Sequence, residues 1–321
     1  MARSLTYGVL AACLGGILTV SAQQQPTFRG RTDAVRLFVT VTDRDGRLVT
    51  TLARENFEVR DEGKPQPLTQ FDNSPQPIRL MVMLDVSGSM NGNLPLLRAA
   101  ATQLFPRLLP DDVARVGAFG REVTISPTFT RDPRELAAAL PTTIEPNAPT
   151  PLWRALTNAL DAFGDATDKR NVILVLSDGK DSGPTGFRER PSSQAEVIDR
   201  ARREEVMIYA IGLRSRPAQR PTPGVGRAGL QAMLLADLPD SGLARVAEES
   251  GGGYTEIRYG QDLGAAFAGV ADELHTQYLL AFAPPERDGK VHEIGVRVDK
   301  GGLKPRARKS YVAPKDQRGR Q

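Results

Sequence analysis

The stretch Ile78-Arg-Leu-Met-Val-Met-Leu-Asp-Val-Ser-Gly-Ser-Met90 is an apolar run that ends in one carboxylate and two hydroxyls. Residues 80–84 are apolar without interruption, which is typical of a central strand in a sheet covered by helices on both faces. Asp85, Ser87 and Ser89 then follow at every second position. Alternate side chains of an extended segment project to the same side, so these three oxygen-bearing groups can converge on one point. The stretch therefore predicts a buried strand that carries a polar loop.

The residue types in this loop favour a metal ion. One carboxylate and two hydroxyls suit a hard cation, because Mg²⁺ takes six oxygen ligands and keeps several of them as water or as atoms of a bound molecule. Asp85-x-Ser87-x-Ser89 after an apolar strand resembles the metal-ion-dependent adhesion site of the von Willebrand factor type A domain. That family adds a threonine from a second loop and an aspartate from a third. Thr150 and Asp178 lie here in the expected order and context.

The resemblance implies a ligand set and a partner. The implied ligands of a divalent cation, Mg²⁺ or alternatively Mn²⁺ or Ca²⁺, some direct and some through water, are Asp85, Ser87, Ser89, Thr150 and Asp178. In that family the remaining coordination position accepts a carboxylate from a partner protein. Asp181 is close in sequence to Asp178, but we expect it to be a solvated loop residue, and we expect Trp153 to be a packing residue.

Strands and helices alternate between residues 76 and 275, which predicts an α/β fold with a doubly wound, Rossmann-like sheet. We expect helices at residues 94–109 and 152–163, and a central parallel strand at 171–176. In open α/β sheets ligands bind beyond the carboxyl ends of the strands, where Asp85 and Asp178 would both lie.

Residues 23–75 and 276–313 show short β-branched runs and hairpin signals such as Asp43-Arg44-Asp45-Gly46. We expect these flanking segments to be β-strands, and we hypothesise that they pair into a small β-sandwich module. The predicted divisions are a signal peptide at 1–22, an N-terminal β segment at 23–75, a type A domain at 76–275, a C-terminal β segment at 276–313 and a basic tail at 314–321.

The first 22 residues predict export. Arg3 precedes an apolar run at 5–20, and Val20-Ser21-Ala22 forms a small-residue cleavage site. We expect a periplasmic or extracellular protein with no transmembrane segment in the mature chain. Cys13 lies in a sequence that resembles a bacterial lipobox, so a lipid anchor is the alternative. Because Cys13 is the only cysteine, cleavage after Ala22 excludes disulfides, zinc thiolate sites and cysteine nucleophiles.

The net charge of +4 is unevenly placed along the 321 residues. Residues 300–321 carry eight basic residues against one acidic residue, Asp316, and residues 214–229 are rich in proline, glycine and arginine without any acidic residue. We interpret both stretches as solvated surface; the alternatives are a patch for an anionic surface at 300–321 and a basic contact loop at 214–229. Residues 300–321 lack the interleaved aromatic residues of nucleic-acid binders. Nucleic acid is therefore not an expected partner.

The sequence favours a protein-binding module over an enzyme. A strand followed by an aspartate also begins phosphoryl-transfer sites of the haloacid dehalogenase type, but that chemistry needs a second acid where Ser87 stands. Only two histidines exist, His275 and His292, and neither lies in a Gly-x-Ser-x-Gly context. No phosphate-binding loop of the Gly-x-x-x-x-Gly-Lys-Ser/Thr type is present. A hydrolase or phosphatase that uses the same cation remains the alternative.

Overall fold

The computed structural model of the chain describes residues 34–164, 169–183, 191–214, 240–258 and 261–316. The expected signal peptide with Cys13, most of the proline- and arginine-rich segment, and the end of the basic tail lie outside these described residues. Among the helices that are described, none has the length and the apolar character needed to cross a membrane.

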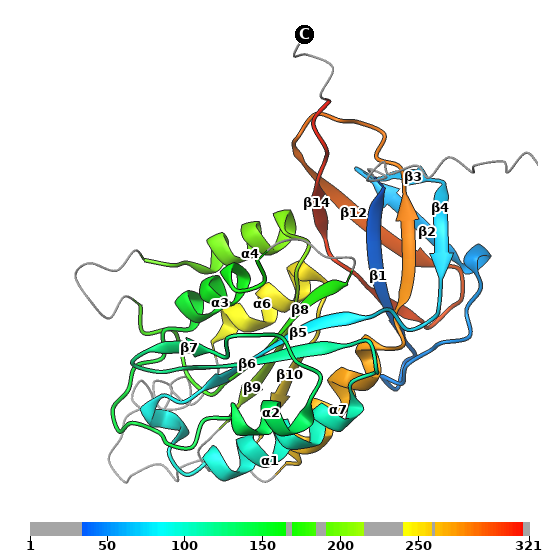
Figure 1. Cartoon of the computed structure of the whole chain (residues 1–321). Coiled ribbons are helices and arrows are strands. Elements are labelled where there is room, and N and C mark those ends of the chain that lie inside the picture. Colours follow the sequence, from blue (N-terminus) through cyan, green and yellow to red (C-terminus); the bar gives the residue numbers. More distant parts are fainter. Residues whose placement is uncertain (1–33, 165–168, 184–190, 215–239, 259–260, 317–321) are drawn as a thin grey trace, which may run out of the picture. The chain divides into compact units, whose positions relative to one another are not determined.

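Six strands form one sheet in the order β10-β9-β8-β5-β6-β7 (Figure 1). Their bounds are β5 Ile78–Asp85, β6 Val113–Phe119, β7 Val123–Ile125, β8 Arg170–Ser177, β9 Met207–Leu213 and β10 Tyr254–Ile257. All neighbours are parallel except β7, which pairs antiparallel with β6 at one edge. Every residue of β5 is buried, as the uninterrupted apolar run predicts for a central strand.

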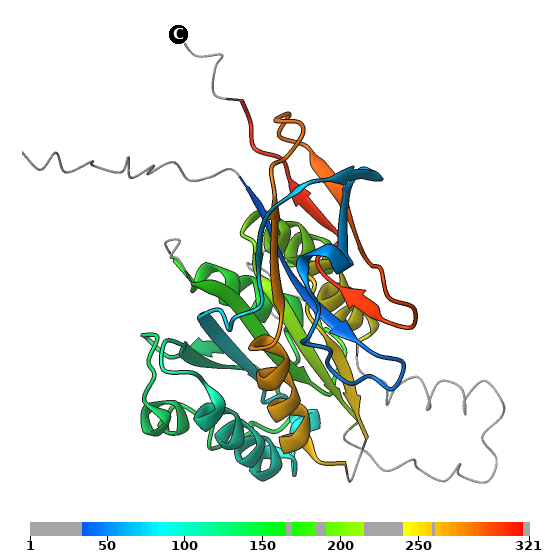
Figure 2. The same cartoon turned by 90° about the vertical axis from the view of Figure 1, so that its right-hand side faces the viewer.

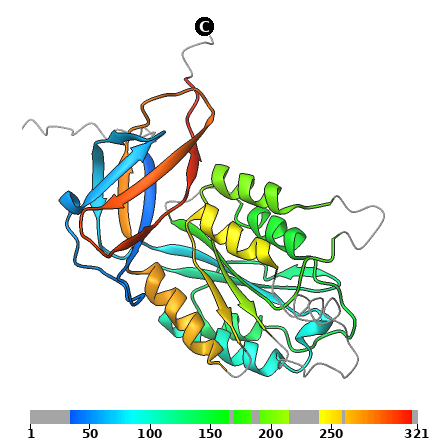
Figure 3. The same cartoon turned by 180° about the vertical axis from the view of Figure 1, so that it is seen from behind.

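Helices cover both faces of this sheet (Figures 1 and 3). They are α1 Leu94–Leu104, α2 Pro133–Ala138, α3 Leu152–Asp161, α4 Gln194–Arg203, α6 Ser241–Ser250 and α7 Leu263–Leu274. Leu80, Val82 and Leu84 of β5 belong to one hydrophobic core with residues of α1, α2 and α7. Met81 and Met83 belong to a second core with residues of α3, α4 and α6. Because alternate side chains of one strand enter two helix-covered cores, the predicted doubly wound α/β fold is confirmed.

The helix expected at residues 94–109 is shorter than predicted. The α-helix ends at Leu104, and the chain continues as a short 3-10 helix, η3 Phe105–Arg107. Pro106 explains the difference, because proline has no N–H to donate to the carbonyl of Thr102 and its ring clashes with that carbonyl in an α-helix. Two more 3-10 helices occur in the described chain, η1 Arg54–Asn56 and η2 Gly88–Met90.

The segments before and after the α/β unit pair with one another in two four-stranded sheets (Figure 2). The first sheet has the order β13-β1-β11-β4 and the second β14-β12-β2-β3. Their bounds are β1 Val35–Thr42, β2 Phe57–Asp61, β3 Lys64–Gln66, β4 Leu68–Asp72, β11 Tyr278–Phe282, β12 Val291–Val298, β13 Lys304–Arg306 and β14 Ser310–Val312. Strand β1 is antiparallel to β11, and β2 is antiparallel to β12.

The two four-stranded sheets share one hydrophobic core, and we call them together the β module. Leu37 and Leu280 of the first sheet are buried in the same cluster as Val59, Ile294 and Tyr311 of the second. A pair of antiparallel sheets with a common core is a sandwich arrangement. The flanking β-strands expected from the sequence are therefore present, and each sheet combines strands from both ends of the chain.

Candidate metal centre

Asp85 is the last residue of β5 and its side chain is fully buried. The N–H of Ser87 donates to Asp85 Oδ1 at 2.8 Å, which turns the chain back over the end of the strand. Ser87 Oγ and Ser89 Oγ lie 2.9 Å apart. The two serine hydroxyls meet as predicted, but not through an extended segment, because Gly88–Met90 forms the 3-10 helix η2.

The loop after β8 approaches the same point. Strands β5 and β8 are parallel neighbours, with Leu84 opposite Leu176, so their carboxyl ends coincide. Ser89 Oγ donates to Asp178 Oδ1 at 2.7 Å, and Ser177 Oγ donates to Asp85 Oδ2. One hydrogen bond thus joins the loops that follow β5 and β8, and the other joins the last residues of the two strands.

Thr150 comes from a third loop, which lies against the other two. The N–H of Gly88 donates to the carbonyl of Ala148 at 3.0 Å, and the N–H of Ser182 donates to the carbonyl of Thr150 at 2.9 Å. A Cβ placed on Gly179 would lie 3.0 Å from Thr150 Oγ1, so this hydroxyl is next to the Asp178 loop. The structure therefore brings together all five residues that the sequence singled out.

Gly88 makes this close approach of loops possible. A Cβ at this position would lie 2.7 Å from the backbone nitrogen of Asn147, which is closer than real Cβ contacts. The φ of Gly88 is not in the left-handed region, so its backbone conformation does not require glycine. Glycine is required because there is no space for a Cβ between the two backbones. Any other residue would push the Thr150 loop away from Ser87 and Ser89.

The electrostatic environment of Asp85 disfavours its charge. Burial raises the pKa of Asp85 to about 7, against the hydrogen bonds from Ser177 and Ser87, and the nearby Asp178 carboxylate raises it further. The hydrogen-bond partners described for Asp85 are neutral groups. Asp85, Ser87, Thr150 and Asp178 are buried and Ser89 is exposed. A cluster of two carboxylates and three hydroxyls is the type of donor set that hard divalent cations bind. The residues present therefore fit such a cation.

Three residues in or next to these loops make contacts that the sequence did not indicate. Ser177 holds Asp85 Oδ2, and only its position at the end of β8, directly before Asp178, could have drawn attention to it. Asp181, expected to be solvated, accepts the N–H of Trp153 at 3.2 Å at the start of α3. Asp240 in turn accepts the N–H of Asp181 at 3.1 Å. Trp153 is buried among residues of α3, α6 and the sheet, in agreement with a packing role.

Comparison with known proteins identifies part of the chain. Residues 80–180 match the family model of the von Willebrand factor type A domain. The matched segment begins inside β5 and ends two residues after Asp178, so it contains all five residues of the cluster. The resemblance to this family is confirmed for that segment. No curated protein matches the chain.

The comparison with solved structures found two proteins from Bacteroides. An aerotolerance-related membrane protein from Bacteroides fragilis is 16% identical, with 61% of this chain and 98% of that chain covered and a TM-score of 0.41. BatB from Bacteroides thetaiotaomicron is 17% identical, with 61% and 97% covered and a TM-score of 0.44. A von Willebrand factor type A protein from Catenulispora acidiphila is 13% identical, with 91% and 76% covered and a TM-score of 0.47.

Proposed function

We propose that this chain is a divalent-cation-dependent protein-binding module. In this proposal Asp85, Ser87, Ser89, Thr150 and Asp178 hold one cation, and an acidic side chain of a partner protein completes its coordination. The observation that carries the proposal is the 2.7 Å hydrogen bond from Ser89 to Asp178, because it joins the loops of two parallel strands beside the buried Asp85. The match of residues 80–180 to the type A domain supports an interaction module.

The composition of the cluster supports a role in binding an outside acid. Two carboxylates bring limited negative charge and the three hydroxyls bring none. A bound Mg²⁺, Mn²⁺ or Ca²⁺ would supply positive charge that attracts a further oxygen ligand. Asp85 would bind as the ionised carboxylate, Ser177 would keep its orientation, and the serine and threonine hydroxyls would contribute neutral oxygens.

The positions of the two histidines support binding rather than hydrolysis. His275 Nε2 lies 2.8 Å from Asp112 Oδ2, at the amino end of the sheet, and Asp112 also accepts the N–H of Ile78 at the start of β5. His292 lies on β12 of the β module. Neither histidine is near Asp85 at the opposite end of β5, so the cluster has no imidazole to act as a general base. We therefore propose a protein that is not an enzyme, and that is exported as residues 1–22 predict.

The experiment is a cation titration of the wild-type protein and of Asp85→Ala. We expect Mg²⁺ to raise the melting temperature of the wild type and to permit capture of carboxylate-rich peptides, and we expect Asp85→Ala to lose both effects. Asp262→Ala is the matched control, because Asp262 is an exposed carboxylate that caps α7 by accepting the N–H of Ala265.

Two results would count against this function. An unchanged Mg²⁺ titration in Asp85→Ala would place the cation elsewhere. Cation-dependent hydrolysis of a generic phosphate ester by the wild type, lost in Asp85→Ala, would favour the phosphatase alternative.

A further inference from the structure

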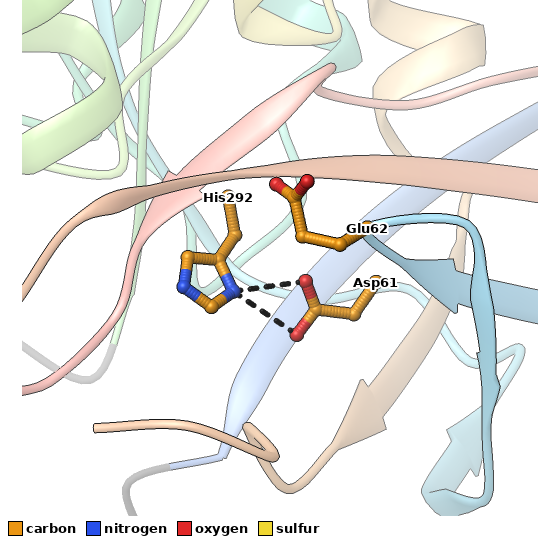
Figure 4. A group of neighbouring side chains, drawn as sticks. All are labelled: Asp61, Glu62 and His292. Atoms are coloured by element: carbon orange, nitrogen blue, oxygen red, sulfur yellow. Dashed lines mark hydrogen bonds and ion pairs between the residues drawn. The ribbon is translucent and has the colours of Figure 1, made fainter. Parts of the chain in front are cut away.

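A second cluster of polar side chains lies in the β module, at His292 on β12. The side chain of His292 is only 7% exposed. Figure 4 shows one of its ring nitrogens facing the Asp61 carboxylate, with Glu62 beside it and the other ring nitrogen pointing away from both. His292 Nδ1 lies 3.0 Å from Asp61 Oδ1 and 3.3 Å from Asp61 Oδ2. A buried imidazole is thus held by a carboxylate at one edge.

Asp61 is itself fixed in this position. It is the last residue of β2, its side chain is fully buried, and it pairs in register with Ile294 of β12. Tyr311 Oη donates to Asp61 Oδ2 at 2.8 Å from β14. Three strands therefore position this carboxylate as an acceptor, and an acceptor at Nδ1 favours the tautomer in which Nδ1 carries the hydrogen and the lone pair is on Nε2.

The second ring nitrogen faces the loop that precedes β12. His292 Nε2 lies 3.3 Å from Asp288 Oδ1. A carboxylate oxygen of Glu286, an oxygen of Asp288 and a ring nitrogen of His292 all lie within 4.8 Å of one another. Glu286 is exposed and Asp288 half-buried, so the loop side of the cluster is open to solvent.

The geometry points to a zinc site formed by His292 Nε2, Asp288 and Glu286, with Asp61 as the residue that orients the imidazole. Zinc bonds to nitrogen and oxygen are about 2.0–2.2 Å, so two ligands of a tetrahedral zinc ion are roughly 3.3–3.5 Å apart. The 3.3 Å separation of His292 Nε2 and Asp288 Oδ1 agrees with this spacing. The flexible side chain of Glu286 closes the remaining distance, and water fills the fourth position.

The donor types distinguish this site from the hydroxyl and carboxylate cluster at β5. Imidazole nitrogen suits Zn²⁺ and neighbouring transition metals, whereas Mg²⁺ and Ca²⁺ are bound through oxygen. A ligating histidine usually donates its other N–H to a carboxylate, which is the role of Asp61 here. The site is independent of the proposed partner-binding function, because it lies in the β module.

The opposite side of the ring is a poorer place for a metal ion. Asp61, Glu62 and His292 also lie close enough to hold an ion. However, both oxygens of Asp61 are already within hydrogen-bond distance of His292 Nδ1, and one also accepts from Tyr311. On the Nε2 side Asp288 Oδ1 also accepts the N–H of Lys290 at 2.8 Å, and Lys290 Nζ lies 3.3 Å from Asp288 Oδ2. The Lys290 side chain is 79% exposed and can turn into solvent, and Asp288 is half-buried, whereas Asp61 is fully buried.

The test is a calorimetric Zn²⁺ titration of the full chain and of the double variant Glu286→Gln/Asp288→Asn. We expect saturable binding of one Zn²⁺ ion by the wild type and a dissociation constant at least ten-fold higher in the double variant. The matched control is Asp43→Asn/Glu55→Gln in the same β module. Asp43 Oδ1 accepts the N–H two residues later at 2.9 Å, as Asp288 Oδ1 does at 2.8 Å. Circular dichroism checks that both variants fold.

A second pair of measurements tests whether Zn²⁺ binds in the β module and not at the β5 cluster, and whether the imidazole is a zinc ligand. Asp178→Asn is expected to keep its Zn²⁺ affinity while losing the Mg²⁺ response. X-ray absorption at the zinc edge is expected to show one imidazole and otherwise oxygen ligands. Absence of saturable Zn²⁺ binding, an unchanged constant in Glu286→Gln/Asp288→Asn, loss of Zn²⁺ binding in Asp178→Asn, or an all-oxygen zinc shell would each overturn the proposal.

Discussion

The central sheet buries an aspartate at each of its two ends, and the two environments shift the pKa of these side chains in opposite directions. At the amino end Asp112 accepts the N–H of Ile78 at 2.9 Å, the N–H of Leu109 at 2.8 Å and a ring nitrogen of His275 at 2.8 Å. Burial opposes its charge, but these hydrogen bonds outweigh burial and lower the pKa of Asp112. At the carboxyl end the hydrogen bonds to Asp85 do not outweigh burial, and its pKa rises to about 7.

Burial alone therefore does not decide whether an aspartate stabilises the fold or is kept for binding. Asp112 has donors on both oxygens and joins β5, the loop before β6 and the end of α7, so it stabilises the fold. Asp85 also has donors on both oxygens, but they are neutral groups, the side chain is fully buried and Asp178 adds a negative charge nearby, so the ionised carboxylate is a cost to the cation-free protein. Such a cost is expected where a side chain is kept for binding, because the ligand supplies the missing interaction.

The largest expected effect comes from removing the satisfied carboxylate. Asp112→Ala leaves the buried N–H of Ile78, the partly buried N–H of Leu109 and an imidazole without their acceptor, so we expect a loss of about 3–5 kcal/mol in the free energy of unfolding. Urea denaturation measures it. The neighbouring exposed Asp111→Ala is the control, with an expected change within about 0.5 kcal/mol. A small effect of Asp112→Ala would remove the contrast between the two ends.

At Asp85 we expect a substitution to raise the free energy of unfolding instead of lowering it. Its folded pKa of about 7 lies above the unfolded value, so the folded state binds more protons and stability falls as the pH rises through this interval. In chelator at pH 8 we expect Asp85→Asn to be more stable than the wild type by roughly 2 kcal/mol, since each pKa unit is worth about 1.4 kcal/mol at most. Thermal unfolding from pH 5 to 8 should show a declining wild-type curve and a flatter variant curve. Parallel curves would contradict the raised pKa.

The smallest expected effect is at Ser177. Ser177→Ala removes one hydrogen bond to Asp85, so we expect a loss of about 1 kcal/mol in stability and weaker Mg²⁺ binding, because the ionised carboxylate loses a donor. Ser74→Ala is a matched control, since Ser74 Oγ donates to Asp72 Oδ1 at 2.7 Å on the exposed surface. Equal stability losses in the two variants would mean that burial does not amplify the Ser177 contact.

Much of the fold could be predicted because its patterns are local. The uninterrupted apolar runs in β5 and β8 identify central parallel strands, and the alternation of strands and helices identifies the doubly wound sheet. The α1 boundary was missed because the helical pattern continues past Pro106, whose missing N–H ends the α-helix. The pairing of β1 with β11 was only a hypothesis, since strand register between distant segments leaves no local signal.

Only part of the candidate site could be predicted from the sequence. Asp85, Ser87 and Ser89 follow one another closely, and a known family pattern pointed to Thr150 and Asp178. Ser177 and Asp112 act through hydrogen bonds that only the folded chain forms. His292 drew attention in the sequence only as a possible catalytic base. Its contacts with Asp61 and Asp288 depend on a strand pairing that no motif encodes.

The β module has its strands at both ends of the chain, and this fixes when it can assemble. Gln277 Nε2 donates to Thr40 Oγ1, which lies 237 positions earlier in the sequence, and β1 pairs with β11 in the same region. At about 5–20 residues per second, a ribosome needs on the order of 10–50 s to deliver the second partner after the first. The contiguous α/β unit can fold during that interval. Strands β1 and β4 must wait for β11 with unpaired edges, so a chaperone would protect the nascent chain most at this stage.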